Sequence, residues 1–275
     1  MKVPAFETLL FEVRGHVALV SLNRPERLNA MNRVMLRELN EACDFIEAED
    51  ALFVAVLTGE GKSFSSGFDL KEQAENTPVG FAEWRRALRQ DFDAVMRFWN
   101  LSKPTIAAVR GHALAGGCEL ALACDVTVAA EDAVFGEPEL KFGAGIVVML
   151  LPWLTNPKLA KEIILTGEDG VSAQDAHRMG LVNRVVPEAE VLDTAISLAE
   201  QMTRMDQSLL RATKLALNRT YEIMGMGRAL EAALDLDLMI EGRGTEDKAR
   251  FLEIARTEGL RAAVAWRDAR FEGSE

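Results

Sequence analysis

The stretch Gly59–Asp69, GEGKSFSSGFD, follows the apolar run Phe53–Thr58, whose composition predicts a buried β-strand. It ends in a turn of small residues, Ser65–Asp69, where little side chain keeps a ligand from the backbone. The N–H of Phe68 can then point into a cavity. Ser and Gly are equally common in plain surface turns, so this stretch alone leaves a binding turn and a surface turn both open.

A second glycine turn, Ala115–Gly117, opens a predicted helix over Ala115–Ala123 that carries Glu119. Unpaired N–H groups at a helix N-terminus can stabilise an oxyanion, although close packing of the helix on a strand favours glycine equally. Glu119 stands among Ala and Leu residues. An acid buried there needs a purpose or a partner, so Glu119 is a candidate catalytic residue.

The loop Phe135–Glu139 brings a further carboxylate, Glu139. If Glu119 and Glu139 approach each other, the pKa of one rises, and a protonated and an ionised carboxyl can coexist near neutral pH. Such a pair suits proton transfer beside a carbonyl that two backbone N–H groups hold. The alternative is that each acid is tied in an ion pair, for example with Arg110 or Lys141.

The order of the predicted elements indicates an α/β protein. Strand and helix patterns alternate as far as about Gly143, and almost all later patterns are helical. We place a soft boundary near residue 200, between a core over residues 1–200 that holds the site and a helical region over residues 201–275. The helices of that region have broad apolar faces, which predicts contact with another subunit. The predicted strands cover Phe6–Val13, Val17–Leu22, Val54–Leu57, Thr105–Val109, Asp125–Ala130 and Val182–Val186. The predicted helices cover Asn32–Ala48, a long segment from Asp69 to about Trp99, Ala115–Ala123, Pro157–Leu165, Ala173–Met179, Val191–Met202, Leu209–Met224, Leu230–Ile240, Asp247–Arg256 and Leu260–Trp266.

The bulk composition is that of an ordinary globular protein with an acidic balance. A formal net charge of −12 argues against nucleic acid and against an anionic membrane as the main partner, because both attract basic surfaces. No apolar run is long enough for a membrane span, and Pro4 and acids interrupt the N-terminal segment, which argues against a signal peptide. The odd count of three cysteines favours free thiols in a reducing compartment, so we expect a cytoplasmic protein.

Several common chemistries lack their residues in this sequence. The three histidines, His16, His112 and His177, have no spacing typical of a metal site or a catalytic triad. There is no nucleophile elbow of the G-x-S-x-G type and no G-x-x-x-x-G-K-[ST] phosphate loop. We therefore expect no metal and no permanently bound cofactor.

Taken together, the motifs resemble the crotonase superfamily, the enoyl-CoA hydratase/isomerase family, over essentially the whole chain. The segments that carry the resemblance are Leu22–Pro25 with Leu28–Met31, Lys62–Leu70, Lys103–Val109 with Gly111–Leu120, Phe135–Glu139, Leu165–Gly167, Ser172–Ala176 and Gly180–Val182. The resemblance implies a spiral core of repeated ββα units with a C-terminal helical trimerisation region. It also implies a homotrimer or a dimer of trimers that acts on an acyl-CoA thioester, with coenzyme A as part of the substrate.

The resemblance also implies roles for single residues. Phe68 and Gly116 match the two N–H donors of the oxyanion hole, which bind the thioester oxygen. Glu119 matches the glutamate that activates water for attack at the β-carbon, and Glu139 the one that delivers a proton to the α-carbon. Contacts with CoA and the thioester are expected from Arg27, Ser65, Phe68, Asp69, Leu70, His112, Gly116 and Gly117. The acyl pocket is expected from Phe81, Trp84, Met96 and Trp153.

One segment departs from the hydratase pattern. Hydratases usually follow the second glutamate with a turn of the P-G-x-G-G type, whereas Gly143–Leu151 has no proline and carries bulky residues. Both acids favour reversible hydration of a 2-enoyl-CoA, but double-bond isomerisation and C–C bond hydrolysis stay open. A non-catalytic relative that binds CoA or RNA is the alternative of a different class. The two intact glutamates argue against the first and the net charge against the second.

Overall fold

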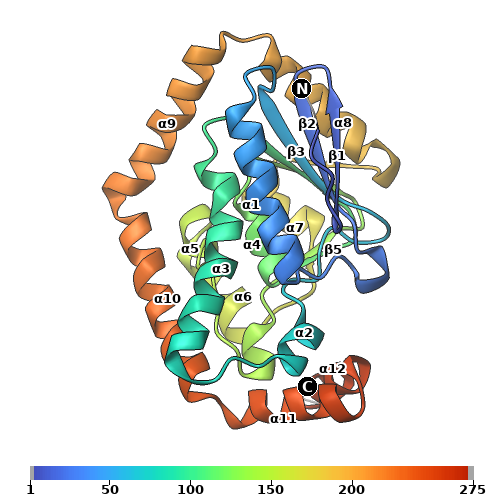
Figure 1. Ribbon diagram of the computed structural model, residues 1–275, viewed down its shortest axis with the longest axis vertical. Helices are drawn as coiled ribbons and strands as arrows, with labels where there is room; N and C mark the ends of the chain where they lie inside the picture. The colour runs from blue at the N-terminus through green and yellow to red at the C-terminus, as the bar shows by residue number, and fades with distance from the viewer. Residues whose placement is uncertain (1–2, 272–275) are drawn as a thin grey trace.

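The computed structural model describes residues 3–271 and contains two β-sheets surrounded by helices (Figure 1). The larger sheet has the strand order β1-β2-β3-β4-β6-β9 and the smaller one β5-β7-β8. Within the described residues, the β1–β2 and β7–β8 pairs are antiparallel and the other pairs are parallel. The strands are β1 Leu9–Arg14, β2 Val17–Leu22, β3 Val54–Gly59, β4 Thr105–Val109, β5 His112–Leu114, β6 Val126–Ala130, β7 Val134–Gly136, β8 Val171–Ser172 and β9 Arg184–Val186.

Successive strands pass from the larger sheet to the smaller one. β4 lies in the larger sheet and β5 in the smaller one, and β6 and β7 repeat that step. A helical segment then returns the chain to the larger sheet. The turn between β4 and β5 needs Gly111, where φ is +55° and a Cβ would lie 1.9 Å from the carbonyl oxygen of Lys62. This repeated strand, strand and helix confirms the predicted spiral of ββα units.

The burial of the strands follows from their places in the larger sheet. β2, β3 and β4 are buried along their whole length, as expected for central strands covered on both faces. β1 is an edge strand, and beyond its first residue its exposed positions alternate with half-buried ones. Helix α1, Arg33–Ala48, packs on β1 and β2, and helix α8, Val191–Thr203, packs on β2, β3, β4 and β6.

The helices largely match the predicted ranges, with one division. The segment predicted as one helix up to Trp99 forms two, α2 over Leu70–Glu75 and α3 over Gly80–Asn100, because Pro78 lies between them. Asn32 caps α1, its side chain accepting a hydrogen bond from the N–H of Met35. The other helices are α4 Gly116–Leu122, α5 Leu151–Leu154, α6 Pro157–Thr166, α7 Ala173–Arg178, α9 Gln207–Met224, α10 Met226–Arg243, α11 Glu246–Thr257 and α12 Leu260–Ala269. Short 3₁₀ helices cover Pro25–Arg27, Glu139–Phe142 and Glu188–Glu190.

The C-terminal helices pass around the core to its far end. Figure 1 shows α9 along the outer edge and α10 leading to the end opposite the N-terminus, where α11 and α12 lie. α10 packs on α3, and α11 packs on α2 and α12. Several large apolar side chains of α9 and α10 are exposed: Leu209, Leu215, Leu217, Ile223, Met224, Leu236, Met239 and Ile240. None of the helices in the described range 3–271 is both long and apolar enough for a membrane crossing.

Candidate active site

The loop after β3 is held in place by hydrogen bonds with the N-terminal motif Leu28–Met31. The fully buried Asn29 side chain donates through Nδ2 to the carbonyl oxygens of Glu60 at 2.9 Å and Ser63 at 2.8 Å. In return the Ser65 hydroxyl donates to the carbonyl oxygen of Asn29 at 2.9 Å. The asparagine of this motif therefore holds the conformation of the loop, and Ser65 is buried as part of that support.

Asp69 closes the same loop and starts the next helix. Its Oδ1 accepts from the N–H groups of Lys71 and Glu72, which caps α2, and its Oδ2 forms an ion pair with Arg24 at 2.8 Å. Both oxygens of the carboxylate are thus engaged within the protein. Asp69 lines the cavity described below, as expected for a substrate contact, but its carboxylate serves the loop.

The two glycines before Glu119 allow the loop and α4 to touch. A Cβ at Gly116 would lie 2.5 Å from Cε2 of Phe68, and one at Gly117 would lie 2.5 Å from the carbonyl oxygen of Ser65. Within residues 3–271, no backbone or side-chain hydrogen bond uses the N–H of Phe68 or of Gly116. Two neighbouring N–H groups therefore stay available, as an oxyanion hole requires.

The residue before these glycines has a strained backbone. Ala115 has φ +53° and ψ −133°, a region that a residue with a Cβ rarely occupies and that typically costs about 1–3 kcal/mol. Its N–H donates to the carbonyl oxygen of Gly136 at 2.8 Å, and its own carbonyl accepts from Cys118 and Glu119. These bonds hold the turn in place and fix the start of α4 against the loop that carries the other acids.

Three glutamates converge behind this turn. One carboxylate oxygen from each of Glu119, Glu137 and Glu139 lies within 4.8 Å of the other two. The three side chains are 1%, 2% and 6% exposed, so water contributes little to their solvation. In the described part of the chain, the Oε2 atom of each finds no hydrogen-bond partner. The other oxygen of Glu119 accepts from the N–H of Val148 at 2.7 Å.

The basic residues that could have neutralised these acids are occupied elsewhere. Arg110 donates to the carbonyl oxygen of Gly59 at 2.9 Å, and Lys141 pairs with Asp169 at 2.9 Å. The ion-pair alternative for Glu119 and Glu139 is therefore not formed. Val148 belongs to the segment Gly143–Leu151 that departs from the hydratase pattern, so this segment positions Glu119 through a backbone N–H.

Burial raises the pKa of all three acids, and the charge of a neighbouring carboxylate adds to it in each case. Burial is the largest cause for Glu119, followed by the charge of Glu139, and the bond from Val148 opposes them. Burial also raises the pKa of Glu137 well above its usual range, with Glu139 and Glu119 adding to it. Burial raises the pKa of Glu139 to about 8, a backbone hydrogen bond lowers it, the charge of Asp237 raises it, and a hydrogen bond with Glu137 lowers it. The cluster can thus hold protonated and ionised carboxyls together near neutral pH.

Glu137 is the member of this cluster to which the sequence analysis gave no role. Its signal was present, because it stands in the same short loop as Glu139 and only two residues before it. β7 ends at Gly136, and the 3₁₀ helix that begins at Glu139 turns both side chains toward α4. Three carboxylates at this spacing could also hold a divalent cation, so the expectation that no metal is required stays a prediction.

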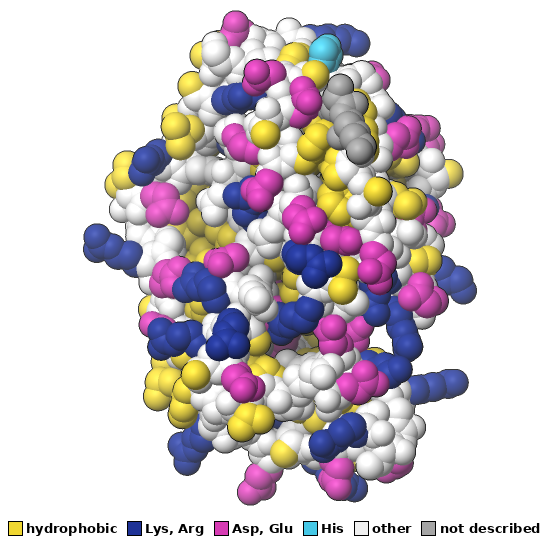
Figure 2. All heavy atoms as spheres, viewed as in Figure 1, with side chains coloured by type: hydrophobic (Ala, Val, Ile, Leu, Met, Phe, Trp, Pro, Cys, Tyr) yellow, Lys and Arg dark blue, Asp and Glu magenta, His cyan; other side chains and the backbone are white. Residues whose placement is uncertain are grey.

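A cavity of about 430 Å³ runs from the loop after β3 to the C-terminal helices. It contains the predicted residues Arg27, Phe68, Asp69, Leu70, Trp84 and Glu139. Its other lining residues include Leu28, Ser66, Lys71, Leu88, Asp91, Ala115, Phe142, Val147, Asp237, Glu241, Lys248, Leu260, Val264 and Arg267. Figure 2 shows Lys and Arg side chains gathered on the face between the main body and the C-terminal helices. The C-terminal region therefore forms one wall of the site.

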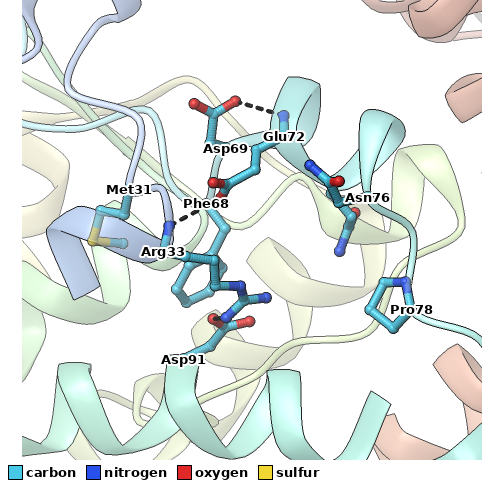
Figure 3. A pocket seen from close by; sticks show the side chains of 9 residues that line it. Met31, Arg33, Phe68, Asp69, Glu72, Asn76, Pro78 and Asp91 are labelled. Carbon is cyan, nitrogen blue, oxygen red and sulfur yellow. Dashed lines mark hydrogen bonds and ion pairs between the residues drawn. The ribbon is translucent and has the colours of Figure 1, made fainter. Parts of the chain in front are cut away.

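A smaller cavity of about 150 Å³ shares Phe68, Asp69, Gln73 and Asp91 with the larger one (Figure 3). Arg33 lies in it and forms an ion pair with Asp91, and the N–H of Arg33 donates to Glu72 at 2.9 Å. Asp91 lines both cavities, so its charge is neutralised at the wall between them.

Several predicted contacts lie elsewhere. Among the described residues, the lining of the large cavity does not include Phe81, Met96 or Trp153. Phe81 is 54% exposed on the first turn of α3 and packs on Gly242, whereas Met96 faces the core from the same helix. Trp153 packs on the hydrophobic core from α5. Of the predicted acyl-pocket residues, Trp84 is the one that reaches the cavity.

Five residues from the predicted binding and catalytic sets stand behind the cavity or outside it. His112 is exposed, with Nδ1 3.4 Å from the Ser63 hydroxyl. Ser65 and Gly117 support the loop without lining the cavity. Glu119 reaches the cavity only through its neighbour Glu139. Gly116 does not line it either, although a Cβ there would lie 2.5 Å from the ring of Phe68, which does.

This fold and this site have counterparts among known proteins. The model of the family described as enoyl-CoA hydratase/isomerase matches residues 12–273. The chain therefore belongs to the enoyl-CoA hydratase/isomerase family. It is 37% identical to a putative enoyl-CoA hydratase of Thermus thermophilus, over 94% of this chain and 98% of the relative. It is 34% identical to a short-chain-enoyl-CoA hydratase of Clostridium acetobutylicum, over 92% and 97%.

A solved structure agrees over nearly the whole length. The crystal structure of an enoyl-CoA hydratase/isomerase from Xanthobacter autotrophicus Py2 superposes with a TM-score of 0.96. It is 56% identical in sequence, and the match covers 98% of this chain and 100% of that one. The resemblance inferred from the motifs is thereby confirmed over nearly the whole chain.

Proposed function

We propose that this protein is an enoyl-CoA hydratase, which reversibly adds water to the double bond of a 2-enoyl-CoA thioester. One observation carries the proposal. Within residues 3–271, buried carboxyl oxygens without a partner lie next to two turns, and each turn has one backbone N–H without a partner, at the end of a cleft with basic residues. The names of the relatives agree with this activity. No permanently bound cofactor is required, and coenzyme A enters as part of the substrate.

The two backbone N–H groups and the two acids have separate tasks in the proposed reaction. The N–H groups of Phe68 and Gly116 receive the thioester oxygen. Glu119 takes a proton from water as the water oxygen bonds to the β-carbon, and the electrons of the double bond move onto the thioester oxygen as an enolate. The protonated carboxyl of Glu139 then gives its proton to the α-carbon, and the carbonyl re-forms. Removing one such N–H donor typically raises the activation free energy by about 3 kcal/mol.

The mouth of the cavity suits the CoA part. Arg27, Lys71 and Arg267 line it from three different segments, and cations of this kind bind phosphate oxygens. Leu70 and Leu260 add apolar surface there. We propose that CoA lies between α2 and α12, with its thioester end pointing toward Ala115.

Double-bond isomerisation is the second candidate, and a specific observation favours it. Glu139 lines the cavity whereas Glu119 does not. A single acid at the cavity wall can remove a proton from one carbon and return it to another. Hydration needs both acids, because water must be activated while the α-carbon is protonated.

The test is a spectrophotometric screen of the purified protein against 2-enoyl-CoA thioesters of short, medium, branched and cyclic acyl groups. We expect loss of the absorbance of the conjugated thioester for at least one class. The Glu119→Gln variant separates the two candidates, since isomerisation that depends on Glu139 should largely survive it. Flat traces across the whole panel would contradict hydration.

We further propose that residues 201–275 assemble the protein into a homotrimer or a dimer of trimers. The exposed leucines, isoleucines and methionines of α9 and α10 support this proposal, because exposed apolar side chains that gather in one region mark interaction sites. Sedimentation analysis should give a mass of three or six chains, and a monomer would contradict the proposal. Three buried free thiols fit the reducing cytoplasm that we propose as its location.

A further inference from the structure

Asp237 on α10 is a buried acid that the proposed reaction does not use. Its side chain lines the large cavity, yet the residue is only 3% exposed. Both of its carboxylate oxygens lack a hydrogen-bond partner among the residues that the structure describes. A buried polar group without a partner costs stability, and such a group beside a cavity is a candidate contact for a ligand.

The acids around Asp237 differ from it because each has a cation. Asp91 is paired with Arg33, as Figure 3 shows, and Glu241 is paired with Lys248. Lys248 also lies 4.6 Å from the ring centroid of Trp84. These contacts use Arg33 for Asp91 and Lys248 for Glu241, and in the described part of the chain Asp237 has no hydrogen-bond donor.

Gly145 provides space for the side chain of Asp237 but no hydrogen bond to it. A Cβ at Gly145 would lie 1.9 Å from Oδ1 of Asp237, so any larger residue would displace the carboxyl. The N–H of Gly145 is directed to Glu241 at 3.4 Å. The glycine therefore makes space for the carboxyl of Asp237 without giving it a hydrogen bond.

The surroundings define the kind of group that would satisfy this carboxyl. Burial raises the pKa of Asp237 to about 7, so it is part protonated and part ionised near neutral pH. Both forms keep an oxygen that accepts a hydrogen bond. The charge of Lys248 disfavours binding of a cationic group beside Asp237, and the charges of Glu241 and Asp91 disfavour an anionic one. Trp84, Leu88 and Val147 line the same cavity with apolar surface. A hydrocarbon group that carries a hydroxyl fits all of these conditions.

We propose that Asp237 is a specificity-determining residue that accepts a hydrogen bond from a hydroxyl on the acyl group of the substrate, beyond the reacting double bond. This inference rests on the proposed function, because it assigns the acyl group of the same thioester. It places the substrate among hydroxylated enoyl-CoA thioesters and not among simple alkyl ones.

The test compares unsubstituted hex-2-enoyl-CoA with its 4-, 5- and 6-hydroxy derivatives. For the wild type, we expect kcat/KM for at least one hydroxylated thioester to exceed that for the parent by about 10- to 100-fold, since a site built for a hydroxyl disfavours an analogue without it. Asp237→Leu should abolish or reverse this preference. Asp235→Leu, a change of an exposed acid on the same helix, should leave it intact. A wild type without preference for any hydroxylated member would overturn the inference, as would a preference that persists in Asp237→Leu.

Binding measurements separate this inference from the proposed function. Calorimetry with hexanoyl-CoA and its hydroxylated derivatives reports recognition without turnover. If no thioester is hydrated but a hydroxylated analogue binds more tightly, hydration fails and the hydroxyl contact stands. If all analogues bind equally and hydration is intact, the hydroxyl contact of Asp237 is contradicted and the proposed function is not. Should Asp237→Leu not fold, the preference of the wild type decides.

Discussion

Two groups of buried acids face each other across the cavity, and they are built differently. Among the described residues, Glu119, Glu137 and Glu139 have no ion-pair partner, and their raised pKa values mean that they hold protons. On the opposite wall, Asp91 is paired with Arg33 and Glu241 with Lys248, and Asp237 has no partner within residues 3–271. An acid that keeps its proton can exchange it with a substrate, whereas Asp91 and Glu241, each paired with a cation, hold a fixed charge. The difference separates the reacting end of the cavity from the recognising end.

The largest expected effect comes from removing the acid at the cavity wall. Glu139→Gln keeps the shape of the side chain but cannot exchange a proton, so we expect kcat to fall by about 10²- to 10⁴-fold. Initial rates on the best substrate of the screen measure this. Glu131→Gln, at an exposed glutamate, should leave the rate unchanged. More than a tenth of the activity remaining in Glu139→Gln would remove Glu139 from the reaction.

On the opposite wall, the largest effect is on stability. Lys248→Met leaves Glu241 buried without its cation, and breaking a buried pair typically costs about 3–5 kcal/mol of unfolding free energy. The double variant Lys248→Met with Glu241→Gln should recover much of that loss. Urea unfolding at neutral pH measures both, with Lys158→Met at an exposed position as control. A single variant within about 1 kcal/mol of the wild type would show that the pair contributes nothing.

The protonated state of the catalytic cluster predicts how stability changes with pH. An unfolded glutamate has a pKa of about 4.3, whereas that of folded Glu139 is raised to about 8. The folded state therefore binds more protons between these values, and the stability that Glu139 contributes is lost as the pH rises through about 8. Glu139→Gln should gain stability relative to the wild type from pH 5 to pH 8.5. Urea midpoints that run parallel over this range would contradict the raised pKa.

The smallest effect concerns Glu137. Its hydrogen bond lowers the pKa of Glu139, so Glu137→Leu should raise that pKa further. Because Glu139 must be protonated to serve the α-carbon, the alkaline limb of the kcat profile should move to higher pH by roughly 0.5–1 unit. Glu137→Gln, which can still donate, should keep the limb near its original place. An unchanged limb in both variants would leave Glu137 a packing residue only.

The parts of the site that depend on local backbone could be predicted from the sequence. Close contacts with Phe68 and Ser65 leave no room for a Cβ at Gly116 and Gly117. Because such contacts restrict the residue type to glycine, they leave a pattern that can be recognised in the sequence. Glu119 was visible because it interrupts an apolar helix. The order of strands and helices predicted an α/β protein, and the spiral of ββα units followed from the resemblance of the motifs to the crotonase superfamily.

The acyl end of the cavity could not be predicted, because it depends on where distant helices lie. Phe81 and Trp84 are three residues apart on α3, yet only Trp84 turns toward the cavity. Asp237 looks like any polar residue on an amphipathic helix, and only the packing of α10 on α3 places it in the cavity wall. No periodicity in the sequence specifies which part of the C-terminal region folds back over the core.

The most direct test of the account is to run the reaction in D₂O and follow the product by NMR. Hydration by this cluster predicts a 3-hydroxyacyl-CoA that carries one deuterium at the α-carbon, with its formation lost in both Glu119→Gln and Glu139→Gln. A product without a 3-hydroxyl group, whose double bond has moved and whose formation survives Glu119→Gln, would contradict hydration and assign the site to isomerisation.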